Sequence, residues 1–176
     1  MAGTVIRTAG AVLIMSGAVG LGRFYGMRLT SRLRILEDLR RLLYLLKGEI
    51  LYANASLEEA FFNVGSRGTG PVKELFSQVA SRLGERQGET FRHMWEEETE
   101  KFRNSLPLTE EDLRQMKDFG RQLGYLDRQM QERTILLYLE QLDFAIGNLR
   151  KHRKEQCRLY TSLSVAGGLF FIIIMC

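Results

Sequence analysis

The chain has 176 residues with 25 Lys and Arg against 21 Asp and Glu, a formal net charge of +4, and only two prolines and two cysteines. This length predicts one domain with a real core, and the scarcity of proline, with stretches rich in Leu, Glu, Arg and Gln, favours helices over strands. Cys157 and Cys176 lack metal-ligand spacing, and two cysteines exclude a disulfide framework.

The first predicted element is a hydrophobic helix at the amino terminus. Thr8 to Gly22 is uncharged, and snorkelling of Arg7 extends the usable span back to Thr4, giving about 19 residues or about 28 Å of helix. That length is enough to cross a typical hydrocarbon core, so residues 1–26 are predicted to be a transmembrane anchor. A cleavable signal peptide is the alternative, which leaves open whether the segment is retained.

A long amphipathic helix follows, from Met27 to about Ala53. Its apolar residues recur in steps of three, four or seven. They are Leu29, Leu33, Leu36, Leu43, Leu46 and Ile50. This pattern predicts one buried stripe on a helix of about 27 residues that continues out of the anchor.

Four shorter helices are predicted next. Ser56 and Glu59 form a capping box for Leu57–Val64, and the segment Gly65–Gly70 is predicted to break the chain. Pro71 then occupies a first helical position. The apolar positions of the next three helices are Val72, Leu75, Phe76, Val79 and Leu83, then Phe91, Met94, Trp95 and Phe102, then Leu113, Met116, Phe119 and Leu123.

Local signals also bound the last two of these six helices. Thr109 and Asp112 resemble a second capping box, Gly124 ends that helix, and Asp127 is predicted to cap the final one. The final helix leads into the uncharged carboxyl-terminal segment 159–176, predicted to be the second transmembrane anchor. Its predicted core positions are Met130, Ile135, Leu139, Leu142, Ala145, Ile146 and Leu149.

The even number of helices indicates the topology. If the first helix leaves the membrane and the sixth returns, the end of the first near Tyr52 meets the start of the last near Asp127 at a tip far from the bilayer. The predicted fold class is therefore all-α, an antiparallel six-helix cytoplasmic bundle over residues 27–158, flanked by N- and C-terminal transmembrane helices.

Basic residues gather beside the two hydrophobic segments. They are Arg23, Arg28, Arg32, Arg34, Arg150, Lys151, Arg153, Lys154 and Arg158. The positive-inside rule places the bundle in the cytoplasm, and anionic lipids are the expected partners of these side chains, so the basic pI needs no nucleic acid to explain it. An acidic run, Glu96–Glu98 with Glu100, is predicted to be a solvated helix face, with docking of a basic partner as the alternative.

The sequence offers no constellation for catalysis. Gly65–Gly70 has the spacing of a phosphate-binding loop, but Pro71 and Val72 stand where lysine and Ser/Thr are needed. His93 and His152 have no cluster of metal ligands on a shared face. We therefore expect no enzyme, no metal, no cofactor and no small-molecule substrate. A membrane protein that responds to phosphate or nucleotide through Gly65–Gly70 is the alternative.

Several short stretches are typical of one family. The most specific is Phe119-Gly120-x-x-Leu123-Gly124-x-x-Asp127-Arg128-x-x-Gln131. Supporting stretches are Leu39-Arg40, Glu49-Ile50-Leu51-Tyr52, Trp95-Glu96-Glu97, Tyr160, Ser162-Leu163 and Ala166-Gly167. On these residues the chain resembles, over nearly its whole length, the stage III sporulation protein AB family of endospore-forming bacteria.

The resemblance implies a platform subunit of the channel complex that joins mother cell and forespore, in the mother-cell membrane facing the forespore. Such proteins are similar to the inner-membrane platform of type II secretion and type IV pilus machines, and a sister ATPase of the same operon is the expected partner, with other membrane proteins of the complex. The tip residues predicted to contact partners are Glu49, Tyr52, Asp127, Arg128 and Gln131. The alternatives are an N-cap for Asp127, core packing for Tyr52, and a signalling or division protein of an unrelated family for the whole chain.

Overall fold

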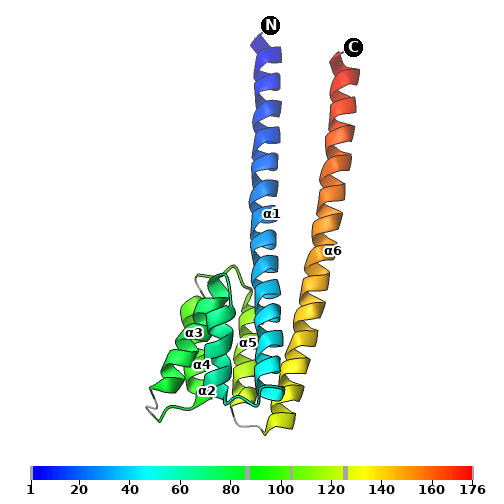
Figure 1. Cartoon of the computed structure of the whole chain (residues 1–176). Helices are drawn as coiled ribbons and strands as arrows, with labels where there is room; N and C mark the ends of the chain where they lie inside the picture. The colour runs from blue at the N-terminus through cyan, green and yellow to red at the C-terminus, as the bar shows by residue number, and fades with distance from the viewer. Residues whose placement is uncertain (1, 86–87, 104, 125–126, 176) are drawn as a thin grey trace. The chain divides into compact units, whose positions relative to one another are not determined.

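The computed structural model describes the backbone of residues 2–85, 88–103, 105–124 and 127–175, and the side chains of residues 27–85, 88–103, 105–124, 127–152 and 155. All regular structure in these residues is helical. The helices are α1 (Ala2–Leu51), α2 (Leu57–Arg67), α3 (Pro71–Gly84), α4 (Phe91–Phe102), α5 (Glu110–Leu123) and α6 (Arg128–Met175) (Figure 1). The prediction of an all-α chain with six helices is confirmed for the part of the chain described.

The chain divides into two compact units. One is the helical bundle Arg32–His152, in which successive helices run in opposite directions (Figure 1), and the other comprises residues 1–31 and 153–176. Among the side chains described, no helix carries an apolar stretch long enough to cross a membrane. The side chains of the two predicted anchors, 1–26 and 159–176, lie outside the described residues, so both anchors stay predictions.

Within the bundle, α1 is buried along more than one stripe. The predicted positions are buried except Leu29, which is half-buried, and Ile35, Leu39 and Leu42 are buried in addition to them. The reason is that helices lie against α1 on more than one side, as its ion pairs to α2, α5 and α6 show, so more than one side of it is covered. These pairs are Glu49–Arg67, Arg32–Asp112, Arg40–Asp143 and Glu37–Arg150.

The helix starts follow the local signals in the sequence. Thr109 and Asp112 form a complete capping box, and Pro71 is the first residue of α3. Ser56 and Asp127 each accept a hydrogen bond from the backbone N–H three residues on, at 3.2 and 2.9 Å. These contacts satisfy N–H groups that a helix start leaves without an intrahelical partner.

The predicted break at Gly65–Gly70 is wrong for Gly65–Arg67 and right for Gly68–Gly70. The helix α2 continues through Gly65 to Arg67, three residues beyond Val64, so only Gly68–Gly70 is loop. A Cβ atom at Gly65 would lie 2.8 Å from Ser77 Oγ, which shows that this glycine lets α2 and α3 approach closely. A segment half of which is helical is not a phosphate-binding loop, because that motif needs consecutive free backbone N–H groups.

The centre of the bundle is an aromatic cluster around Trp95. This side chain is fully buried, and its Nε1–H donates a hydrogen bond to the Met116 carbonyl at 2.6 Å. Four phenylalanine rings surround it with centroids 5.6 to 6.0 Å away. They are Phe61, Phe76, Phe91 and Phe119. A Cβ atom at Gly120 would lie 2.0 Å from Trp95 Cδ1, so the indole ring occupies the space beside this glycine.

Candidate functional site

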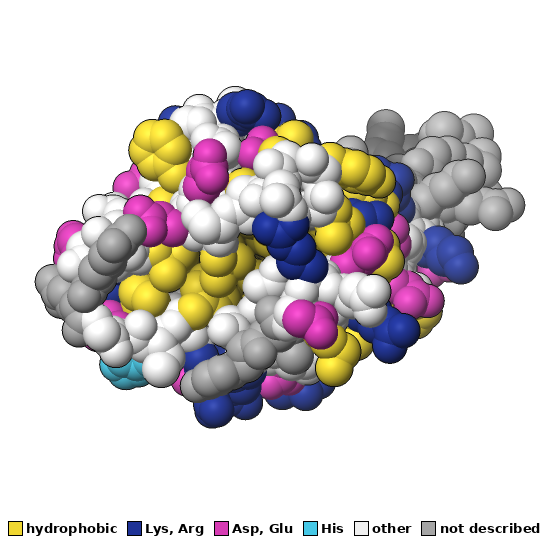
Figure 2. Space-filling model, turned by 60° about the horizontal axis from the view of Figure 1, so that its bottom comes forward, with side chains coloured by type: hydrophobic (Ala, Val, Ile, Leu, Met, Phe, Trp, Pro, Cys, Tyr) yellow, Lys and Arg dark blue, Asp and Glu magenta, His cyan; other side chains and the backbone are white. Residues whose placement is uncertain are grey.

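The predicted tip lies where α1 ends and α6 begins. Arg128 donates a hydrogen bond from Nη2 to the Asn54 carbonyl at 3.2 Å, which ties the start of α6 to the turn after α1. Tyr52, in the same turn, is 85% exposed. Figure 2 looks onto this end of the bundle and shows hydrophobic side chains gathered between basic and acidic ones. The structure therefore brings together two of the predicted contact residues, Tyr52 and Arg128, on an accessible end.

The other three predicted tip residues are engaged within the chain. Asp127 is exposed and caps α6, which confirms the N-cap alternative. Gln131 donates a hydrogen bond to the Leu123 carbonyl at 3.3 Å. The Glu49 side chain is only 12% exposed and is held by α2, where Asn63 and Arg67 lie 2.8 and 2.9 Å from its carboxylate. The core-packing alternative for Tyr52 is wrong, since a residue that exposed has no core role.

The basic residues beside the predicted anchors differ in what their side chains do. Arg32 makes a bidentate ion pair with the buried Asp112, at 2.7 and 2.9 Å. Arg150 binds Glu37 at 2.7 Å, whereas Arg34 and Lys151 are exposed, as is Arg28. The side chains of Arg23, Arg153, Lys154 and Arg158 lie outside the described residues. The charge of Arg32 is thus balanced inside the bundle, and Arg34 and Lys151 present theirs to the surface.

The acidic run on α4 is only partly a solvated face, because Glu97 and Glu100 are exposed and Glu98 is not. Glu98 is buried and binds Arg82 and Lys101 at 2.9 and 2.7 Å, so that part of the prediction is wrong. Its neighbours in the run are also paired with basic residues of the bundle. The pairs are Glu96–Arg121, Glu96–Arg92, Glu97–Arg82, Glu100–Lys117 and Glu100–Arg103. A basic partner would have to compete with all of these pairs.

The stability of the bundle should depend on pH through this run. Hydrogen bonds from Arg121, Arg82 and Lys117 hold the pKa values of Glu96, Glu97 and Glu100 below their ordinary value of 4.5. A carboxyl whose pKa is lower in the folded state contributes stability above its unfolded pKa and loses it as the pH falls through the folded pKa.

We therefore expect the free energy of unfolding to be flat between about pH 7 and about pH 5 and to fall below about pH 4.5. Urea denaturation followed by the fluorescence of Trp95, the single tryptophan of the chain, measures it. Glu97→Gln should make the fall on acidification shallower. A free energy that rises on acidification would contradict the pairing.

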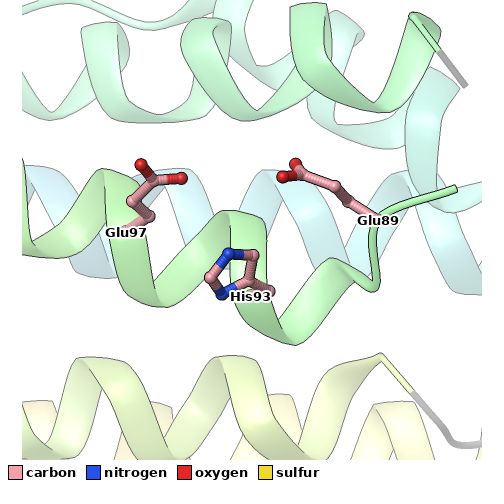
Figure 3. Close-up of side chains that lie close together, drawn as sticks. All are labelled: Glu89, His93 and Glu97. Carbon is pink, nitrogen blue, oxygen red and sulfur yellow. The ribbon is translucent and has the colours of Figure 1, made fainter. Parts of the chain in front are cut away.

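A cluster that sequence reasoning missed lies at the start of α4. Glu89, His93 and Glu97 are four residues apart, and their possible ligand atoms lie within 4.8 Å of one another; Figure 3 shows His93 on α4 between the two glutamates. The prediction that His93 has no such neighbours is therefore wrong. However, Arg82 of α3 binds Glu89 at 2.6 Å and Glu97 at 2.7 Å, so a cation would have to displace its guanidinium. These carboxylates join α4 to α3.

The outward face of α6 is the second feature that sequence reasoning missed. Met130, predicted to be core, is 47% exposed. It lies on the opposite side of α6 from the buried Ile135, Leu139 and Leu142. Leu136, Leu137 and Phe144 on the same helix are also exposed. The spacing of seven between Met130, Leu137 and Phe144 was the signal that could have found this face.

Comparisons with known proteins agree on one family. Residues 7–176 match the family model described as Stage III sporulation protein AB. Stage III sporulation protein AB of Bacillus subtilis (strain 168) is 26% identical over 171 residues, which cover 97% of this chain and 99% of that protein. A solved structure of a stage III sporulation protein AB has a TM-score of 0.65 at 27% identity and covers 71% of this chain and 98% of that one.

Proposed function

The chain belongs to the stage III sporulation protein AB family, and from this membership we propose that it is a membrane-anchored platform subunit of the secretion-like channel complex needed for endospore formation. In this role it performs no catalysis. It docks a cytoplasmic ATPase and the membrane partners of the complex, with the bundle on the cytoplasmic side of the mother-cell membrane that faces the forespore.

The observation that carries the docking role is the exposed tip. Tyr52 is 85% exposed at the end of α1, and Arg128 lies in the same turn region through its bond to Asn54. Tyrosine and arginine are enriched among residues that dominate binding energy at protein interfaces. When a partner covers a large aromatic side chain that is exposed at the end of a bundle, the burial makes the free energy of binding more favourable.

The positions of the exposed basic residues support the same orientation. Arg34 is 18 residues before Tyr52 on α1, which is about 27 Å along a helix. A basic region that far from the tip leaves the tip free for a cytoplasmic protein while Arg34 and Lys151 face anionic lipid. The two predicted anchors at the ends of α1 and α6 would hold the bundle in that orientation.

Recruitment of the sister ATPase tests this proposal. We expect Tyr52→Ser and Arg128→Glu each to lower co-purification of the ATPase with the full chain about tenfold, equal to about 1.4 kcal/mol, because each removes a tip contact. Arg128→Glu also removes the bond to Asn54, worth about 1 kcal/mol of stability, so the melting of each variant is followed by circular dichroism.

Tyr44→Ser is the matched control. Tyr44 is an exposed tyrosine on α1, away from the tip, with the Arg40 guanidinium 5.0 Å from its ring centroid. It should leave recruitment unchanged. Equal recruitment by the wild type and both tip variants would show that the tip is not the docking site.

A further inference from the structure

The helix α6 is apolar on two sides. Its inner face carries the buried Ile135, Leu139 and Leu142, which pack in the bundle core. Its outer face carries Phe144, 72% exposed, and Leu137, about half exposed, with Met130 one further heptad toward the tip. A helix that is apolar on opposite sides is ordinarily covered on both. Residues spaced by seven form the seam that a second helix packs against.

This outer face borders a groove between α5 and α6. The groove has a volume of about 680 Å³, and Leu137, Phe144 and Ala145 form its α6 wall. Gln115 stands on the α5 wall. A smaller cavity continues it toward the tip and shares Gln115, Leu137 and Gln141 with it. A helix laid on α6 would therefore fit between α6 and α5 rather than rest on a single convex surface.

Carboxylates outnumber basic side chains in the lining of the groove. Glu111, Asp112 and Glu140 line it, and Arg32 is the one Lys or Arg side chain among the lining residues that the structure describes. Two of these carboxylates are paired within the chain, Asp112 with Arg32 at 2.7 Å and Glu111 with Arg114 at 2.6 Å. The Glu140 side chain lies between Leu137 and Phe144 in sequence, is exposed, and has no ion pair within the described residues. A carboxylate between two apolar anchors favours a basic residue opposite it.

We propose that the α5–α6 groove, with Leu137 and Phe144 as apolar anchors and Glu140 as the charged contact, docks a basic amphipathic helix of another protein of the complex. The partner helix places apolar residues seven apart on the anchors and a lysine or arginine against Glu140. This surface is separate from the tip and does not depend on ATPase docking there.

Two other occupants fit this surface less well. Two copies of the chain held in one membrane would bring their α6 helices together in parallel, which sets Glu140 against Glu140, a like-charge contact that is unfavourable. Anionic lipid would be repelled by the unpaired Glu140 carboxylate in the groove. A basic helix satisfies both the apolar seam and the charge.

Photocrosslinking from the full chain in membranes of sporulating cells tests the proposal. A benzophenone amino acid replaces Phe144 in one strain and Phe62 in another; Phe62 is a phenylalanine of similar exposure, 65%, on α2. The crosslinked peptides are sequenced by mass spectrometry. We expect position 144, and not position 62, to capture one segment with apolar residues seven apart and a basic residue beside them.

A charge reversal makes the test specific. Glu140→Arg should lower the crosslink from position 144 about tenfold, equal to about 1.4 kcal/mol, and reversal of the basic residue in the captured segment should restore it. The proposal would be overturned if position 144 captured a second copy of this chain, lipid alone, a segment without that pattern, or nothing. It would also be overturned if Glu140→Arg left the yield of the crosslink unchanged. ATPase recruitment should stay normal in these strains, which separates this result from failure of the tip.

Discussion

Gly120→Ala should destabilise the bundle by about 3 kcal/mol, because the new methyl group would occupy space that the indole ring already fills. A Cβ atom there would lie 2.0 Å from Trp95 Cδ1, far inside van der Waals contact. The ring has no free direction of escape, since four phenylalanines surround it and its N–H is bonded to the Met116 carbonyl. Small domains are stable by only about 5 to 15 kcal/mol, so this is a large fraction of the total.

Urea denaturation of the full chain in detergent, followed by far-ultraviolet circular dichroism, measures the effect. Gly48→Ala is the matched control. Apart from the adjacent backbone of α1, no atom lies within 4 Å of a Cβ at Gly48, so this change should stabilise α1 by about 0.5 to 1 kcal/mol through helix propensity. If Gly120→Ala and Gly48→Ala shift the denaturation midpoint alike, the close packing on Trp95 is wrong.

Arg32→Ala is expected to cost about 3 kcal/mol, the second large effect. Asp112 is buried and its carboxylate binds the Arg32 guanidinium at two points, 2.7 and 2.9 Å, so removal of the arginine leaves a buried negative charge. The bonds from the Thr109 N–H and hydroxyl, at 2.8 and 2.7 Å, remain and keep the cost near the low end for a broken buried pair.

A double-mutant cycle isolates this pair. Asp112→Asn removes the charge but keeps an oxygen for the helix cap, so Arg32→Ala should cost less when it is combined with Asp112→Asn than in the wild type. Arg34→Ala, at an exposed position of the same helix, should change the free energy of unfolding by less than about 0.5 kcal/mol. Additive losses in the cycle would show that the two side chains do not interact.

The local part of the fold was predictable from the sequence. The caps at Ser56, Thr109 and Asp127 and the start at Pro71 depend on residues within one turn of each other, and all four lie where the sequence places them. The predicted chain break at Gly65 is wrong, because glycine there serves close packing and does not end the helix. Its role depends on Ser77, twelve residues away on another helix, and no local pattern contains that contact.

In the candidate site, too, some features were predictable from the sequence and others were not. Proximity of Tyr52 to the start of α6 followed from the parity of the helices, and the bond from Arg128 to Asn54 agrees with it. The burial of Glu98 and the clamp of Arg82 across α3 and α4 were not predictable, since each depends on how two helices are rotated against one another. A run of glutamates looks the same in sequence whether it faces water or guanidinium groups.

The order of the aromatic residues along the chain bears on biogenesis. Within the described residues, the rings that touch Trp95 belong to residues 61 to 119, and all of them are synthesised before α6 begins. Domains generally fold as units during synthesis, the amino-terminal parts first. The four short helices can thus close around the indole while the last helix is still being translated. If residues 159–176 form the membrane anchor that the sequence predicts, this anchor reaches the insertion machinery after the four short helices have folded.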